Sequence, residues 1–331
     1  MDALTALLDG PKARGALLLK AVLTPPWAVR IEDRAPISVL TMVHQEAWII
    51  PDCGAPVLIR PGDVALLRGP DPYTIADRPD TPVGIVVGPD QRCGTTGGAD
   101  LTEALCRGVR TWGDTPGPDS AVMLSGTYQA PSEVGRRLLD ALPALVVRPR
   151  ALNRSPLVAL LAEEVGRDEP GQELVLDRLL DLLFVGVLRH WLADPTAGCP
   201  AWHRAQSDPV VGPALELLHQ YPCRAWTVAS LADAVGVSRA ALARRFGAVV
   251  GEPPMTYLAG WRLTLAADLL REPGATVAAV ARRVGYGSAF ALSTAFKRVR
   301  GVSPQQYRAG LEGRTRPAPV PAPPRTLVLG G

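Results

Sequence analysis

The chain has 331 residues, which favours two or three domains, and 47% of them are hydrophobic, which excludes a chain that is disordered throughout. Its net charge of +3 hides an asymmetry, because residues 1–208 carry 20 basic and 26 acidic side chains whereas residues 209–310 carry 12 basic and 5 acidic ones. A basic C-terminal module on an acidic N-terminal body indicates that one part binds a polyanion and the other has a different task.

The N-terminal segment MDALTALLDG lacks the basic region and apolar core of a secretory signal, and no run of about 18 uncharged apolar residues follows it. The five cysteines are odd in number and form no CxxC pair, which argues against a disulfide framework and a cysteine-based zinc site. These patterns favour a cytoplasmic protein with reduced thiols and no membrane partner.

From about residue 21 to residue 88, short apolar and β-branched runs such as ISVLTMVHQEAWII alternate with Pro, Gly and Asp turn signals. One more strand is expected in AVMLSGTYQA. Closely spaced short strands are typical of an antiparallel sandwich or small barrel. We therefore predict a β-rich domain over residues 1–130.

After Pro131 the pattern becomes helical, in SEVGRRLLDALPALVV, SPLVALLAEEVGRDEPG and QELVLDRLLDLLFVGVLRHWLAD. The third segment has a broad apolar face formed by Leu174, Leu179, Leu182, Leu183, Val187 and Trp191. So apolar a helix needs a partner. Packing against the β-rich domain is the simpler explanation, and a second subunit is the alternative, which makes residues 155–192 a candidate dimerisation region.

The C-terminal region contains a duplicated pattern, because VGVSRAALARRFGAVVGEPPMTYL returns about fifty positions later as VGYGSAFALSTAFKRVRGVSPQQYR. The residues that recur at one offset are Ser238 and Ser288, Phe246 and Phe296, Gly251 and Gly301, Pro254 and Pro304, and Tyr257 and Tyr307. A single internal duplication explains this agreement in order and spacing.

Each repeat predicts a short helix, a tight turn and a second helix. In the first repeat Gly236 ends the first helix and Ser238 caps the second, and Ser288 has the same capping role in the second repeat. Small residues, Ala232 and Ala281, stand where the two helices cross. This is a helix-turn-helix pattern, whose second helix enters the major groove of DNA. The connecting segment MTYLAGWRLTLAADLLRE predicts a rigid helix that holds two recognition helices about one DNA turn, ~34 Å, apart.

The two repeats together resemble the DNA-binding domain of the AraC/XylS family of bacterial transcription regulators over about one hundred residues. The region VHQEAWII…LIRPGDVALLRGPDPYTIAD resembles the cupin-type sensor domain of a subgroup of that family. The resemblance implies an α+β multidomain protein with three parts and a tail. These are an N-terminal cupin-like β-barrel or sandwich (1–130), a helical linker (131–207), a C-terminal all-α domain with two helix-turn-helix units (208–310), and a Pro-rich disordered tail (311–331).

The resemblance also implies a function: a sequence-specific transcription regulator, such as an activator, controlled by a small effector or a redox signal. Its expected partners are double-stranded DNA, a second copy of the chain and an unidentified effector, with RNA polymerase as a further candidate. By motif position the DNA-contacting residues are Arg239, Ala240, Arg244, Arg245, Ser288, Phe290, Thr294, Lys297 and Arg298. Arg244 is the strongest candidate for base recognition, because a guanidinium pairs bidentately with guanine.

The second recognition helix departs from the more familiar pattern of the family, in which a basic or polar residue is frequent at the position of Thr294. Phe290 donates no hydrogen bond, so this helix either recognises thymine methyl groups or contacts mainly backbone, and Phe290 as a core residue is the alternative. Leu242, Phe246, Leu292 and Phe296 are expected in the core. The charges of Arg282, Arg283 and Arg300 are either solvated or placed against phosphates.

In the predicted sensor domain, His44, Glu46 and Tyr73 are candidates for an effector pocket, as a hydrogen-bonding trio in an apolar barrel. The alternative for His44 is a partly buried histidine that its neighbours satisfy. A catalytic cupin binds a metal through several histidines, and only His44 of the four lies in the strand region. We therefore expect no metal and no cofactor.

Three cysteines of this domain, Cys53, Cys93 and Cys106, are redox candidates. Cys93 lies in a Gly-rich segment beside Arg92, whose charge would lower the thiol pKa and favour the reactive thiolate. The alternative is that all three are buried and inert. An enzyme is disfavoured because nucleophile-elbow, phosphate-loop, HExxH and dinucleotide motifs are missing from the sequence. A nonspecific architectural DNA-binding protein is the remaining alternative, with affinity that falls steeply with salt.

Overall fold

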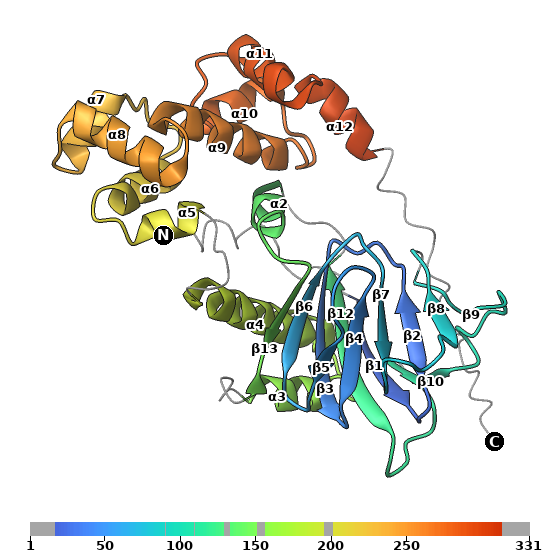
Figure 1. Ribbon diagram of the computed structural model, residues 1–331. Helices are drawn as coiled ribbons and strands as arrows, with labels where there is room; N and C mark the ends of the chain where they lie inside the picture. The colour runs from blue at the N-terminus through green and yellow to red at the C-terminus, as the bar shows by residue number, and fades with distance from the viewer. Residues whose placement is uncertain are drawn as a thin grey trace. The chain divides into compact units, whose positions relative to one another are not determined.

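The computed structural model describes residues 17–312 except residues 90, 109, 129–132, 151–155 and 195–200. Two compact units, residues 1–212 and 213–331, make up the chain, and each is described by itself (Figure 1). The predicted Pro-rich tail lies outside the described residues from position 313 onward. No helix within the described ranges has the length and apolar character needed to cross a membrane.

The N-terminal unit contains two β-sheets (Figure 1). Sheet A has the order β10 (Cys106–Gly108), β11 (Thr111–Gly113), β1 (Leu17–Leu23), β12 (Ala121–Tyr128), β3 (Ile37–His44), β6 (Val64–Arg68) and β13 (Leu145–Arg148). Sheet B has the order β5 (Val57–Ile59), β4 (Ala47–Pro51), β7 (Tyr73–Ala76), β2 (Ala28–Ile31), β8 (Ile85–Val87) and β9 (Cys93–Thr95). The pairs are antiparallel except β1 with β11 and β2 with β8.

The two sheets pack face to face, and strand alternation explains how sheet A is buried on both sides. On β6, Ala65 and Leu67 belong to the core between the sheets, whereas Val64 and Leu66 belong to a second core formed with helices. Burial of both faces accounts for the nearly continuous apolar runs in the sequence of this sheet. The predicted cupin-like sandwich is confirmed.

The segment that we predicted as one helix after Pro131 is a helix followed by a strand. Helix α2 spans Glu133–Leu139, and β13 (Leu145–Arg148) then pairs antiparallel with β6. Pro143 accounts for the change, because the residue before a proline is disfavoured in helical conformation and the β-branched Val146 and Val147 follow. The helical prediction over this segment was therefore wrong in its second half.

The predicted linker helices belong to the N-terminal unit. Helices α3 (Leu157–Glu164) and α4 (Gln172–Ala193) share a hydrophobic core with the outer face of sheet A. Gly126 on β12 permits this approach, since a Cβ there would lie 2.6 Å from Cδ2 of Leu180 on α4. Helices α3 and α4, which we predicted as parts of a linker, are thus an integral layer of this unit, because their apolar side chains complete its core.

The face of α4 that packs on the sheet differs in part from the predicted one. Its buried apolar residues are Leu176, Leu180, Leu183, Phe184, Val187, Leu188, Trp191 and Leu192. Leu174 and Leu182, which we expected on the packed face, are 60% and 53% exposed. The helix has apolar residues on more than one side, so its sequence alone does not show which side faces the sheet.

Helix α5 (Ala201–Gln206) closes the N-terminal unit, and α6 (Val211–Gln220) leads into the C-terminal one. The C-terminal unit then consists of α7 (Val228–Ala234), α8 (Arg239–Val250), α9 (Pro254–Leu269), α10 (Val277–Arg283), α11 (Ala289–Arg300) and α12 (Pro304–Glu312). Helices α7 and α8 form the first helix-turn-helix unit, and α10 and α11 form the second. Helix α9 connects them, as predicted.

The duplicated residues have matched structural roles in the two repeats. Ser238 and Ser288 are N-caps of α8 and α11, Gly251 and Gly301 are their left-handed C-caps, and Pro254 and Pro304 begin α9 and α12. The rings of Phe246 and Tyr257 lie 5.8 Å apart at 69°, and those of Phe296 and Tyr307 lie 5.5 Å apart at 68°. The repeat preserves the residues that begin, end and brace each recognition helix.

Candidate DNA interface

The first helix of each unit starts at a threonine cap that we did not predict. In the first unit, Ser230 N donates to Thr227 Oγ1 at 3.0 Å and Thr227 N donates to Ser230 Oγ at 2.9 Å, which is a reciprocal capping box. In the second unit, Ala279 N donates to Thr276 Oγ1 at 3.2 Å. The Thr-Val-Ala pattern before both helices was the signal available in the sequence.

A glycine forms the turn of each unit. Gly236 has φ +72° and Gly285 has φ +83°, which is the left-handed region that glycine adopts without strain. In the first unit the residue after the glycine closes the turn, because Val237 N donates to the carbonyl of Ala232 at 3.0 Å. The equivalent bond in the second unit joins Tyr286 N to the carbonyl of Ala281 at 2.8 Å. Both alanines are buried, as predicted for the point where the helices cross.

The orientation of each recognition helix follows from its buried residues. Leu242 and Phe246 on α8, and Leu292 and Phe296 on α11, are completely buried, as predicted. The nine side chains that we expected to contact DNA are all exposed: Arg239, Ala240, Arg244, Arg245, Ser288, Phe290, Thr294, Lys297 and Arg298. Phe290 is 80% exposed, so the alternative that it is a core residue is excluded.

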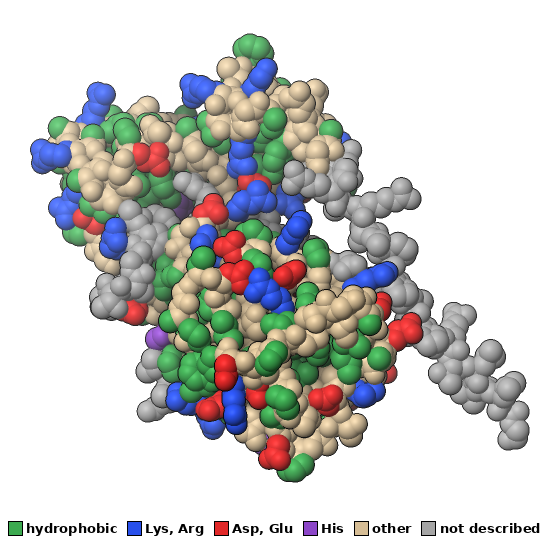
Figure 2. Space-filling model, turned by 45° about the vertical axis from the view of Figure 1, so that its right-hand side comes forward, with side chains coloured by type: hydrophobic (Ala, Val, Ile, Leu, Met, Phe, Trp, Pro, Cys, Tyr) green, Lys and Arg blue, Asp and Glu red, His purple; other side chains and the backbone are tan. Residues whose placement is uncertain are grey.

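The further arginines of the unit have different surroundings. Arg283 pairs with Glu272 at 2.9 Å, and Arg300 lies over the rings of Phe296 and Tyr307 at 5.8 and 5.9 Å. Arg282 is exposed in the last turn of α10, next to the turn of the second unit. Figure 2 shows several Lys and Arg side chains and few Asp or Glu side chains on the visible face of this helical unit. Its surface suits a polyanion.

Sequence reasoning missed a contact that joins the two helix-turn-helix units. Arg262 on α9 donates from Nε to the carbonyl of Pro222 at 2.7 Å and from Nη2 to the carbonyl of Arg224 at 2.8 Å. The same loop lies against the second turn, because a Cβ on Gly285 would be 2.7 Å from Cys223 Cα. Burial lowers the pKa of Arg262 from its ordinary value. A half-buried guanidinium thus holds the segment before the first unit against the turn of the second.

The structure does not bring His44, Glu46 and Tyr73 together. Tyr73 is buried and bonded to Ser38, and burial raises its pKa far above the ordinary value. His44 is at the other end of β3, six residues from Ser38 or roughly 20 Å along the strand. The prediction that these three side chains share one pocket is therefore wrong, because His44 and Tyr73 are too far apart.

His44 and Glu46 are themselves exposed. The Nδ1 of His44 donates to the carbonyl of Ser120 at 2.9 Å, so a neighbour satisfies it as in the alternative interpretation, although the side chain is exposed and not partly buried. Glu46 lies 4.0 Å from Arg60 in an exposed ion pair. Nothing in this arrangement concentrates polar groups on one small ligand.

The cysteines also differ from expectation. Cys93 is buried in the core between the sheets, where burial, with a smaller effect of the Asp100 carboxylate, raises its pKa to about 11. The prediction of an activated thiolate beside Arg92 is thus wrong, because burial and a nearby negative charge both raise the thiol pKa. Cys53 and Cys106 are exposed, and the alternative that they are buried is excluded.

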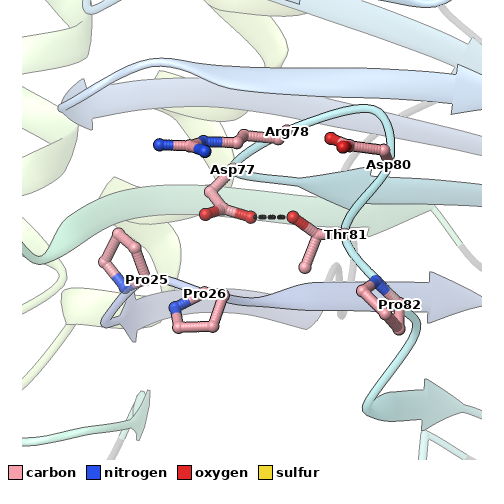
Figure 3. A pocket seen from close by; sticks show the side chains of 7 residues that line it. All are labelled: Pro25, Pro26, Asp77, Arg78, Asp80, Thr81 and Pro82. Atoms are coloured by element: carbon pink, nitrogen blue, oxygen red, sulfur yellow. Dashed lines mark hydrogen bonds between the residues drawn. The ribbon is translucent and has the colours of Figure 1, made fainter.

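A surface hollow of about 430 Å³ lies on the N-terminal unit and is lined by Pro25, Pro26, Asp77, Arg78, Asp80, Thr81 and Pro82 (Figure 3). The Asp77 carboxylate accepts from Thr81 Oγ1 at 2.6 Å and from Trp27 N at 3.3 Å, so it braces this loop. Within the described residues, no three His, Cys, Asp or Glu side chains are grouped to hold a metal ion.

Two matched helix-turn-helix units on a rigid connecting helix, in one chain with a cupin-like sandwich, define a DNA-binding transcription regulator. Residues 2–193 match the family described as Cupin, and residues 231–310 match the family described as Helix-turn-helix domain. A protein of Streptomyces lividans named as an AraC-like transcription regulator is 35% identical over 316 residues, 93% of this chain and 98% of its own length. The chain belongs to this AraC-like family.

Two further similarities cover less of the chain. The regulator AlkR of Acinetobacter baylyi is 34% identical over 203 residues, which is 59% of this chain and 65% of that protein. The DNA-binding domain of AdpA, a global transcriptional factor solved in complex with a target DNA, is 33% identical, with a TM-score of 0.31. That similarity covers 33% of this chain and 97% of the AdpA domain.

Proposed function

We propose that the chain binds one extended operator through both recognition helices and that its N-terminal unit controls this binding in response to a signal. The observation that carries the proposal is the matched construction of the two units. Equivalent serine caps, glycine C-caps and buried phenylalanines support α8 and α11, and every assigned contact residue on them is exposed.

Arg244 is the proposed base-recognition residue of the first unit. It is exposed in the middle of α8, and the planar guanidinium matches the O6 and N7 acceptors of guanine. Arg239 and Arg245, with Lys297 and Arg298 on the second helix, are proposed phosphate contacts, which position the helices without selecting sequence.

Selection of random duplex DNA by the purified full-length chain at near-physiological salt tests this proposal. We expect a motif with two blocks about one helical turn apart, and Arg244→Ala should lose a guanine preference in one block with a penalty of about 1–3 kcal/mol. A Lys297→Ala variant is the control, since loss of a phosphate contact weakens all sequences alike and lowers the salt dependence. Binding without a motif would favour the nonspecific alternative.

The signal is proposed to be a small effector or thiol oxidation, acting by a shift between two conformational populations. With Cys93 buried, the exposed Cys53 and Cys106 are the thiols of the N-terminal unit that an oxidant reaches first, and Cys223 is exposed on the C-terminal unit. Operator binding is then measured with and without oxidant for wild type and for Cys53→Ser and Cys106→Ser. A response to oxidant that survives in both variants and in their combination excludes these two thiols and directs attention to the exposed Cys223, whereas a wild type that does not respond directs attention to a small effector.

A homodimer through α4 is proposed from the exposed side of that helix. Leu174, Val175 and Leu182 are exposed on a helix whose opposite side is packed on sheet A, and Leu160 is exposed on α3. Sedimentation at micromolar concentration, with and without operator, tests it. A monomer under both conditions would contradict it, and Leu182→Asp should shift a dimer towards monomer. We further propose that the protein acts in the bacterial cytoplasm, at promoters served by RNA polymerase. We also propose that it has no catalytic activity.

A further inference from the structure

Phe290 lies where a recognition helix meets the bases. Ser288 caps α11, with Ala291 N donating to Ser288 Oγ at 3.1 Å, so Phe290 is the second residue of the helix. In helix-turn-helix proteins the N-terminal residues of the recognition helix contact base edges. Phe290 is 80% exposed, whereas Phe296 on the same helix is completely buried. The core of the unit does not use the Phe290 ring, which leaves it in water.

The first unit has different chemistry at the equivalent positions. The offset of fifty that relates the repeats pairs Ala240 with Phe290 and Arg244 with Thr294. All four side chains are exposed, and in each unit the second position, Arg244 or Thr294, follows the first, Ala240 or Phe290, by about one helical turn. The first unit therefore presents a small side chain and a guanidinium, and the second presents an aromatic ring and a side chain with one methyl and one hydroxyl.

The charges of the second recognition helix are displaced towards its C-terminal end. Lys297 and Arg298 are exposed in its last turn, at positions that Gly247 and Ala248 occupy in the first unit. In α11 the groups suited to phosphates are thus separated from the N-terminal turn. That turn is left with apolar contact as its main means of recognition.

Only one group in the major groove matches such a surface. Guanine, cytosine and adenine present donors and acceptors there, while thymine adds a C5-methyl group to its O4 acceptor. A phenyl ring has no donor or acceptor and cannot satisfy the polar groups that it would cover, so its contact with them is unfavourable. The methyl of Thr294 extends the apolar surface, and its hydroxyl can donate to O4.

We propose that Phe290 and Thr294 make the second unit a reader of thymine C5-methyl groups, whereas the first unit recognises guanine through Arg244. This inference rests on the proposed function, in which α11 enters the major groove. It predicts an operator whose two halves differ in chemistry, although the caps and buried residues of the two units are nearly identical.

The test uses the full-length chain and the operator obtained by selection, with each thymine of the second block replaced in turn by deoxyuridine, which removes only the methyl group. At one or two positions we expect affinity to fall about fourfold, the effect of one buried methyl group. The same replacement should have no effect on Phe290→Ala, because the ring that contacts the methyl is gone. When those thymines are replaced by cytosine, affinity should fall. An operator with 5-methylcytosine at the same positions should bind more tightly than the one with cytosine and recover part of the affinity seen with thymine.

Two controls distinguish this inference from the proposed function. Val299→Ala removes another exposed apolar side chain, 59% exposed near the C-terminal end of α11, and should keep the deoxyuridine effect. In the first block, 7-deazaguanine should weaken wild type and leave Arg244→Ala unchanged. A selected motif whose second block has no base preference, or deoxyuridine effects that are equal in wild type and Phe290→Ala, would overturn the inference and leave the proposed function standing. Selection without any motif would overturn both.

Discussion

The two turn glycines provide a matched pair of substitutions with different expected effects. Both have positive φ, so an alanine at either position carries the strain of the left-handed region, about 1 kcal/mol. At Gly236 a Cβ would meet nothing within 4 Å. At Gly285 it would lie 2.7 Å from Cα and 2.8 Å from the carbonyl oxygen of Cys223, both backbone atoms. Something must move in the second unit and nothing in the first.

The segment that would have to move is held by Arg262. Its two hydrogen bonds, at 2.7 and 2.8 Å to the carbonyls of Pro222 and Arg224, come from a charged donor, and each is worth about 1.5–3 kcal/mol. Gly285→Ala should therefore lose one such bond in addition to the φ strain, about 2.5–4 kcal/mol in total. Gly236→Ala should cost about 1 kcal/mol.

Native-state hydrogen exchange of the full-length chain measures this difference locally. We expect amides of α10 and α11 in Gly285→Ala to exchange about 10–150 times faster relative to wild type than amides of α7 and α8 in Gly236→Ala, which corresponds to the one lost bond. Arg262→Met should already have released the loop, so Gly285→Ala should cost less in that background. Equal effects of the two glycine substitutions would refute the reasoning that the loop and the second turn are in contact.

Three further predictions concern caps, packing and charge. Ser238→Ala and Ser288→Ala should each cost about 1 kcal/mol, seen as faster exchange in α8 and α11 respectively, and an effect spread over both helices would contradict independent caps. Gly126→Ala should destabilise the N-terminal unit by about 1–3 kcal/mol in thermal unfolding, because its Cβ would press on Leu180, and Leu180→Ala should relieve much of this. Asp52→Asn should cost less than about 1 kcal/mol at pH 7. The bidentate arginine lowers the pKa of Asp52 below its unfolded value, so this contribution is present at neutral pH and disappears as pH falls through the folded pKa; stabilities that stay apart in acid would contradict it.

The sequence was most informative where structure is local. Each recognition helix is defined within some twenty residues by a cap, a buried leucine and phenylalanine, and a C-terminal glycine, so Ser288, Phe296 and Gly301 could be assigned before any contact was known. The contact of Arg262 with the loop before α7 spans about forty residues and involves backbone carbonyls. Such a contact leaves no pattern in the sequence, because any residue supplies a carbonyl.

The N-terminal unit was less predictable because its elements are placed by distant partners. The strand β13 is fixed by pairing with β6, some eighty residues earlier in the chain. Tyr73 and His44 are both in the strand region, but their separation depends on strand direction and register, which short apolar runs do not specify. The pKa of Cys93 depends on the depth of its strand in the core, and the adjacent arginine in the sequence was misleading.

Sheet A packs against sheet B on one face and against α4 on the other. It therefore lies between the proposed sensing part of the N-terminal unit and the proposed subunit contact. Along β6, Ala65 faces the core between the sheets, and Leu66 faces α4. Since close-packed interiors transmit displacement, a ligand or modification that repacks the sandwich also moves the side chains beneath α4. The other side of that helix presents Leu174 and Leu182, which we propose as part of the subunit contact. A signal received by the sandwich would therefore have a continuous packed route to the proposed subunit contact.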